Sequence, residues 1–375
     1  MRSLKKFMAA GLAAAMVFSM TACSSKPAET AAPETQAETT ADTTAEAVEE
    51  AKTEAAEAVE GKDPAEVKVG ISIYQFADNF MTVYRQELER YLTEELGVKK
   101  ENISIMDGKN DQGEQMNQIR NFITTGVDVM IINLVQASSE PTVTEECAKA
   151  GIPVVYINRE PEAEREQAWV DEGIKATYVG ADARQSGTFQ GEEIAELENK
   201  GDADGDGVVR YIMVQGDPEN VDAQYRTEFS IKALTDAGIE VEELVKMRGD
   251  WDQTKGQEIT ANALAQHGAK IDVVFCNNDA MALGALQSIE AAGRTVGDDI
   301  FLVGVDALSE ALDKVEEGKM TGTVFNDHIS QSHSAADAAV KYLAGEENEH
   351  YIGCDYVKVT TDNVADIKEM TKLFN

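Results

Sequence analysis

Short apolar runs rich in β-branched residues alternate with longer amphipathic segments from Val67 to the end of the chain. The runs predict strands at residues 67–74, 102–106, 127–133, 153–158, 177–180, 208–215, 241–247, 273–277, 301–305, 322–325 and 356–359. The amphipathic segments predict helices that include residues 80–96, 112–125, 186–197, 222–237 and 254–267. This alternation is typical of parallel sheets with crossover helices, so we predict an α/β fold.

The number of predicted strands favours two sheets, because eleven are many for one twisted open sheet. A charged stretch at residues 159–173, which we expect to be irregular, separates two series that begin with the same βαβα rhythm. We therefore place a division after Asn158 and expect two Rossmann-like lobes with parallel sheets.

The start of the chain has a composition unlike the rest. A basic beginning followed by an apolar segment predicts an export signal at residues 1–22. Small residues directly before Cys23 form a lipobox-like pattern, which predicts a lipid anchor on this cysteine; the alternative is an ordinary signal with an incidental cysteine. Residues 24–62 are mostly Ala, Thr and Glu without an aromatic residue, so we expect a disordered acidic tether.

The net charge of −36 argues against nucleic acid as a partner and favours a neutral or cationic small ligand. The chain has no GxGxxG after its first strand, no GxxxxGK[ST] loop and no GxSxG elbow, so we do not expect an enzyme. Cys147, Cys276 and Cys354 are widely spaced and odd in number, which predicts buried thiols instead of a disulfide framework.

Asp and Asn residues follow the apolar runs repeatedly, at the carboxyl ends of the predicted strands. Ligands of open α/β sheets bind at this edge, where such side chains converge. Phe80 and Trp251 stand in polar surroundings beside these positions, and an aromatic face can cover the C–H face of a sugar ring. Ordinary packing of both rings is the alternative. Arg226 lies four residues after Asp222, so it can serve a ligand or form a surface salt bridge.

A second polar pattern occupies residues 202–208, where Asp202, Asp204 and Asp206 alternate with small residues. Alternating carboxylates followed by Gly supply the turn and the oxygen ligands that Ca²⁺ prefers. Met213 stands where a full EF-hand loop requires Glu, so a bidentate carboxylate would have to come from elsewhere. The alternative is an acidic loop between a helix and a strand.

Five motifs together resemble the bacterial galactose/glucose-binding proteins: residues 74–80 (YQFADNF), 132–135 (INLV), 222–226 (DAQYR), 277–282 (NNDAMA) and 304–308 (GVDAL). They follow in order and with matching spacing over residues 67–375. The resemblance implies a type I periplasmic-binding-protein fold, with two lobes joined by three hinge crossings. Its lobes would be residues 63–158 plus 327–358 and residues 159–326 plus 359–375.

The resemblance also implies a sugar site in the cleft between the lobes. Asp78 would accept from the hydroxyl that distinguishes glucose from galactose, while Phe80 and Trp251 would sandwich the ring. The remaining hydroxyls would be held by Asn133, Asn220, Asp222, Arg226, Asn278, Asp306 and Asn326. Asn220 departs from the family, which commonly has His there, and this leaves the preferred sugar open.

The same resemblance implies a calcium site made by Asp202, Asp204, Asp206, the backbone of Val208 and Asp272. Two residues depart from the family pattern. Arg210 stands where the family usually has Gln, and Asp272 replaces a longer Glu. A cationic side chain beside the ion lowers calcium affinity through Coulomb repulsion unless it turns away.

These features predict a monomeric, extracytoplasmic binding protein, held on the outer face of the cell membrane through Cys23. It would capture D-galactose or D-glucose and deliver it to the permease subunits of an ABC importer; by resemblance it could also signal to a chemoreceptor. A protein of the same fold for ribose or a signalling furanose is the main alternative. A sugar-responsive transcription regulator would need DNA-binding helices before Val67, where this chain has a signal and a tether. A sugar dehydrogenase would need a phosphate-binding loop.

Overall fold

The computed structural model describes residues 62–372. The predicted export signal, the lipid-modified Cys23 and all but the last residue of the predicted tether lie outside the described residues. Within residues 62–372, no helix combines the length and the apolar character needed to cross a membrane.

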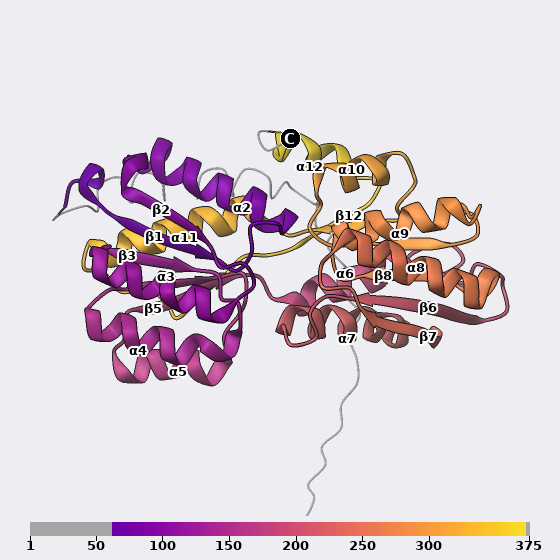
Figure 1. The fold of residues 1–375 in the computed structure, drawn as a ribbon. Coiled ribbons are helices and arrows are strands. Elements are labelled where there is room, and N and C mark those ends of the chain that lie inside the picture. Colours follow the sequence, from indigo (N-terminus) through magenta and orange to yellow (C-terminus); the bar gives the residue numbers. More distant parts are fainter. Residues whose placement is uncertain (1–61, 373–375) are drawn as a thin grey trace, which may run out of the picture. The chain divides into compact units, whose positions relative to one another are not determined.

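The first sheet is parallel throughout and has the strand order β11-β5-β4-β3-β1-β2 (Figure 1). Its strands are β1 (Val69–Ile73), β2 (Ile103–Asp107), β3 (Val129–Ile132), β4 (Val154–Ile157), β5 (Ala176–Gly180) and β11 (Tyr351–Gly353). The helices around it are α2 (Asn79–Arg90, extended by a π-helical turn at Tyr91–Glu95), α3 (Gln112–Thr125), α4 (Glu140–Ala150), α5 (Ala163–Glu172) and α11 (His328–Leu343).

Both faces of this sheet are covered, because successive strand residues point to opposite sides. Val129 and Ile131 pack with apolar residues of α2 and α11, whereas Met130 and Ile132 pack with those of α3, α4 and α5. The strands are therefore apolar at nearly every position, as expected for a parallel sheet buried on two sides.

The second sheet has the parallel order β7-β6-β8-β9, with β6 (Val208–Gln215), β7 (Glu240–Arg248), β8 (Val273–Cys276) and β9 (Phe301–Val303). An antiparallel pair, β10 (Thr323–Phe325) and β12 (Val357–Val359), continues it through the bridges Val303–Gly322 and Asp306–Phe325. Its helices are α6 (Ala183–Ala195), α7 (Val221–Asp236), α8 (Gln253–His267), α9 (Asp279–Ala291), α10 (Ser309–Glu316) and α12 (Val364–Met370). Short 3₁₀ turns occur in both lobes: in the first at Pro64–Glu66, Lys100–Asn102 and Ala137–Ser139, and in the second at Gly268–Lys270.

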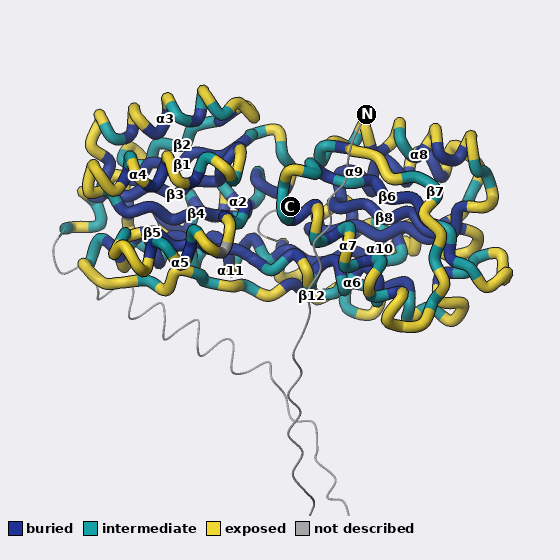
Figure 2. Tube along the Cα trace, turned by 90° about the horizontal axis from the view of Figure 1, so that it is seen from below, coloured by how far each residue is buried: buried dark blue, intermediate teal, exposed yellow. Residues whose placement is uncertain are grey.

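The central strands of the second sheet are likewise covered on both faces, whereas β7 at its edge is largely exposed. Ile212 and Val214 pack with α8 and α9, while Tyr211 and Met213 pack with Ile194 of α6 and Leu234 of α7. Figure 2 shows the result, with buried strands inside and exposed positions mainly on the outer turns of the helices.

Three segments connect the two lobes, between β5 and α6, between β10 and α11, and between β11 and β12. The predicted α/β fold of two lobes with three crossings is thus confirmed, and each predicted strand overlaps an observed one. The strand β11 was not predicted, because three residues at a sheet edge leave little pattern in the sequence.

The boundary that we placed after Asn158 differs from the strand pairing. β5 pairs with β4, so the first lobe continues to Gly180, and β12 pairs with β10, so residue 357 already belongs to the second lobe. Residues 159–173 are also not irregular as expected, because they contain α5. Trp169 anchors this helix: it is buried, stacks on Tyr156 with ring centroids 5.4 Å apart and donates to Glu140 at 2.7 Å.

Candidate functional site

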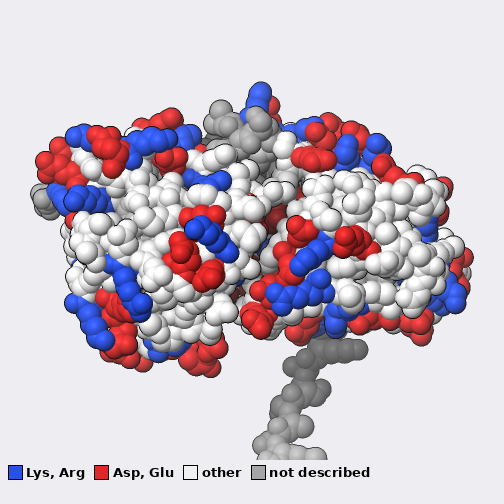
Figure 3. All heavy atoms as spheres, viewed as in Figure 1, with Lys and Arg blue, Asp and Glu red and all other residues white. Residues whose placement is uncertain are grey.

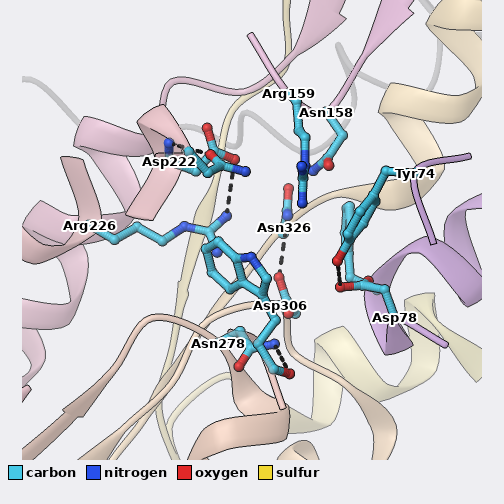
Figure 4. Close-up of a pocket in the computed structure, with 12 residues that line it drawn as sticks. Tyr74, Asp78, Asn158, Arg159, Asp222, Arg226, Asn278, Asp306 and Asn326 are labelled. Carbon is cyan, nitrogen blue, oxygen red and sulfur yellow. Dashed lines mark hydrogen bonds and ion pairs between the residues drawn. The ribbon is translucent and has the colours of Figure 1, made fainter. Parts of the chain in front are cut away.

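A polar cavity lies at the carboxyl ends of strands from both sheets. It is lined by Tyr74, Asp78, Phe80, Asn158, Arg159, Asn220, Asp222, Arg226, Trp251, Asn278, Asp306 and Asn326. Figure 4 shows Tyr74 and Asp78 on one side of the cavity, Asp222 and Arg226 on the other, and Asp306 and Asn326 between them. Nine of the ten predicted sugar-binding residues therefore come together here.

Helix capping explains why several of these side chains stand at strand ends. Asp78 accepts from the Met81 N–H at 2.7 Å and caps α2, and Asn278 caps α9 in the same way at 3.0 Å. Asn220 caps α7 by accepting from the Asp222 N–H at 2.8 Å. Each cap satisfies an otherwise unpaired backbone donor and holds the side chain at the cavity in one orientation.

The wall from the first lobe is a layered group of three side chains. The Tyr74 hydroxyl donates to Asp78 at 2.6 Å, and burial together with the Asp78 charge raises the pKa of Tyr74 well above its usual value. The guanidinium of Arg159 lies 3.7 Å from the centroid of the Tyr74 ring and donates to the Val135 carbonyl. Arg159 is 6% exposed, so its charge is held in place beside the cavity.

Arg226 is buried on the opposite wall and anchored by its neighbours. Its Nη1 donates to the Asn277 carbonyl at 2.8 Å, its Nη2 donates to the Tyr356 hydroxyl at 3.0 Å, and Asp222 lies 3.8 Å away. The surface salt bridge considered above is thus a buried ion pair. Burial raises the pKa of Asp222, while Arg226 opposes that shift. The buried Nε of Arg226 has no hydrogen-bond partner among the described residues.

Asp306 contributes a buried carboxylate held in an uncommon backbone conformation, with φ at 122°. It accepts from Asn326 Nδ2 at 3.3 Å, and Asn326 in turn accepts from Gln331 at 2.6 Å. Burial raises the pKa of Asp306 well above its usual value, and the charges of Asp279 and Asp78 act in the same direction. Strained, desolvated groups of this kind concentrate at functional sites.

Both predicted aromatic walls line the cavity, and both also pack against core residues. Phe80 is buried and meets Tyr84 edge-on with centroids 6.0 Å apart. Trp251 is half-buried with φ at 65°, and its indole lies against Gly216, where a Cβ atom would come within 2.3 Å of the ring. Gly216 is therefore required for this placement of the indole.

Asn133 is the one predicted sugar-binding residue outside the cavity lining. It is fully buried and ties three strand ends together: its Oδ1 accepts from the Tyr74 N–H at 3.2 Å, and its Nδ2 donates to the Ile157 carbonyl at 3.1 Å. The same Nδ2 donates to Asn158 at 3.1 Å. In this structure Asn133 positions the wall and does not form it.

Tyr74, Asn158 and Arg159 were not predicted as site residues, although all three line the cavity. They stand directly after β1 and β4, so the strand-end rule that found Asp306 also covers them. Because we assigned Arg159 to an irregular segment, we did not recognise its position at the end of a strand.

The thiols of Cys147, Cys276 and Cys354 are free, and the first two are buried as expected.

The predicted calcium loop brings carboxylates together, but it also contains a cation. Oxygens of Asp202, Asp204 and Asp272 lie within 4.8 Å of one another. Arg210 Nη2 lies 2.8 Å from Asp206, and its Nη1 lies 3.9 Å from Asp204. A guanidinium supplies no oxygen ligand and repels a divalent ion, so these residues do not fit the calcium site that the resemblance implies.

Comparison with known proteins places residues 69–347 in the family described as periplasmic binding protein domain. The chain is 31% identical over 315 residues to the D-galactose/methyl-galactoside binding periplasmic protein MglB of Haemophilus influenzae, covering 80% of this chain and 92% of that protein. It is 34% identical over 302 residues to a putative rhizopine-binding protein of Rhizobium meliloti, with the same coverage of both chains.

Solved structures with the same architecture include an ABC transporter solute binding protein from Bacillus halodurans with bound myo-inositol. It is 29% identical with a TM-score of 0.70, covering 82% of this chain and 99% of that one. A galactofuranose binding protein has a TM-score of 0.73 at 23% identity and the same coverage, which shows the shared fold.

Proposed function

Since the chain belongs to the periplasmic binding protein family, whose members bind sugars outside the cytoplasm for ABC transporters, we propose that it captures a hexose, D-galactose or D-glucose. The observation that carries this proposal is the cavity itself, where Phe80 and Trp251 stand among carboxylates and amides at the strand ends. Aromatic faces suit the C–H faces of a pyranose, and the polar groups suit its hydroxyls.

The charges of the cavity support a neutral ligand with many hydroxyl groups. Asp222 and Asp306 are buried beside Arg226, so carboxyl groups and a guanidinium stand close together before a ligand arrives. A hydroxyl can donate to a carboxylate and accept from a guanidinium at once. The unpaired Nε of Arg226 is a donor that a ligand oxygen can satisfy.

Both lobes contribute lining residues, so a bound ring contacts two bodies connected by a three-segment hinge. A ligand stabilises the closed arrangement because only that arrangement makes both sets of contacts. Hinge closure around a ligand is known for periplasmic binding proteins as a class. The closed form is the state that we propose is recognised by the permease subunits and, if this chain also serves chemotaxis, by a chemoreceptor.

A lipid on Cys23 is part of the same proposal. An anchored receptor on a flexible tether stays near its permease at a high effective concentration.

The distribution of charge on the surface agrees with capture of a small molecule. On the face in Figure 3, acidic and basic side chains are interspersed, and this face has no broad basic patch that would bind nucleic acid.

Myo-inositol is a second candidate ligand, because a 29% identical solved structure holds it. It is also a six-membered ring carrying hydroxyls on every carbon, so the same aromatic walls and carboxylates would serve it. Ribose remains an alternative as well, since the ribose import binding protein RbsB of Bacillus subtilis is 28% identical over 282 residues.

Calorimetric titration of the purified protein with D-galactose, D-glucose, myo-inositol and ribose tests these alternatives. We expect saturable binding of one hexose per chain with D-galactose or D-glucose. Heat with myo-inositol alone would identify a cyclitol receptor of the same family. Heat with ribose alone would show that the six-membered-ring assignment is wrong, and an absence of heat with all four would contradict the proposal.

A further inference from the structure

The loop at residues 202–207, which precedes β6, has its carboxylates already engaged with the protein. Asp202 accepts from the N–H groups of Gly205 and Gly207 at 2.8 and 2.9 Å. Asp272 is fully buried and accepts from the N–H groups of Ala203 and Arg210 at 3.2 and 2.7 Å. These bonds shape the loop and fix it to the segment before β8.

Backbone N–H groups satisfy hydrogen bonds of these carboxylates, but they add no positive charge to the loop. Oxygens of Asp202, Asp204 and Asp272 lie within 4.8 Å of one another, so carboxyl groups of like charge are crowded here. A cation close to this cluster reduces the repulsion and stabilises the assembled loop.

Arg210 supplies that cation from β6 itself. Its guanidinium lies 2.8 Å from Asp206 in the loop, and its Nε donates to Glu242 of β7 at 3.0 Å. Its Nη1 also lies 3.9 Å from Asp204, so one guanidinium is shared among carboxylates of the loop and of β7. The planar fork of Arg can bridge two carboxylates in a way that the point charge of Lys cannot.

We propose that Arg210 takes the structural place of a metal ion in this lobe. The guanidinium joins the loop to the neighbouring strand β7, so the loop is held by an internal ion-pair network and the protein folds independently of calcium. The inference does not rest on the proposed sugar, because none of the residues in this network lines the polar cavity.

The first test is the melting temperature of the purified protein in 5 mM calcium and in excess EGTA. We expect the two temperatures to agree within about 1 °C, and calorimetric titration with calcium chloride to give no binding heat. A rise of several degrees in calcium, or a saturable binding isotherm, would overturn the proposal without any variant being made.

The second test is Arg210→Gln, which removes the cation and leaves the carboxylates. We expect this variant to melt at a lower temperature in EGTA and to regain most of the loss when calcium is added. The matched control is Arg120→Gln, because Arg120 pairs with Glu146 at 2.7 Å on the surface of the other lobe. The control should change little and should not respond to calcium. An Arg210→Gln variant that is unaltered, or that calcium fails to rescue, would show that Arg210 does not stand in for an ion.

Discussion

Asp78, Asn220 and Asn278 each serve two purposes with a single side chain. One oxygen caps a helix, and the same group lines the cavity. A cap is a strong local signal in a sequence, so the positions of these residues could be predicted together with the helix starts. The stack of Arg159 on Tyr74 could not, because no local pattern shows which ring a distant guanidinium will cover.

The two tryptophans of the chain give a residue-scale prediction. Trp251 lines the cavity, whereas Trp169 is buried between α5 and β4 in the first lobe. Saturating sugar should therefore change the fluorescence of the wild type and of Trp169→Phe, but not that of Trp251→Phe. We also expect Trp251→Phe to bind roughly 2- to 10-fold more weakly in calorimetry, because a smaller aromatic face remains. A retained signal in Trp251→Phe would place the ligand elsewhere.

The helices and strands could be predicted well where the apolar pattern is long. Residues 159–173 show where that pattern misled us, since the charged face of α5 concealed the buried Trp169. Local pattern also did not show which sheet β5 and β12 would each join, because strands of the same composition can join either sheet. In the structure β5 pairs with β4 in the first lobe, and β12 pairs with β10 in the second. Only the packing of the connecting helices decides between them.

A buried acidic residue lies where helix α6 packs against the segment before β10. Glu193 is 3% exposed and lies close to Gly322, directly before β10. Burial raises the pKa of Glu193 well above its usual value, so the folded state favours the protonated form. The stability that this group contributes is full below about pH 4.5 and is lost as the pH rises through the raised pKa.

Glu193→Gln should consequently melt at about the same temperature as the wild type at pH 4.5. At pH 8 it should melt higher than the wild type, by roughly 2–4 °C for each kcal/mol that the substitution adds to the free energy of unfolding. The control is Glu198→Gln, because Glu198 is exposed shortly after the same helix. Its difference from the wild type should stay constant between the two pH values. A constant difference for Glu193→Gln as well would contradict a protonated Glu193.

At the scale of the whole molecule, the site exists only when both lobes are present. Asp78 comes from the first lobe and Asp306 from the second, and each is one wall of the same cavity. A ligand that contacts both therefore couples the lobes, and its binding free energy appears as added stability of the entire chain.

Sugar at about 100 times its dissociation constant should add about 2.7 kcal/mol, which corresponds to a rise in melting temperature of roughly 5–10 °C. Asp78→Asn keeps a capping side chain for α2, and Asp306→Asn keeps the shape of the second wall, but each loses the carboxyl group that accepts from a ligand hydroxyl. We expect both to weaken binding about 10- to 150-fold and to remove most of the rise. Asp298→Asn, an exposed control in the second lobe, should retain it. A full rise in either site variant would show that one lobe suffices.

The two-lobed α/β architecture and most of the polar residues of the site could be predicted from the chain, because apolar periodicity, helix caps and strand ends are local properties. Contacts in the folded molecule show which residues only support the site and which complete it. Asn133 became a clamp between strand ends, Arg159 became a wall, and Arg210 became the cation of the acidic loop. These roles depend on contacts between segments far apart in the chain, and such contacts exist only after the sheets have packed.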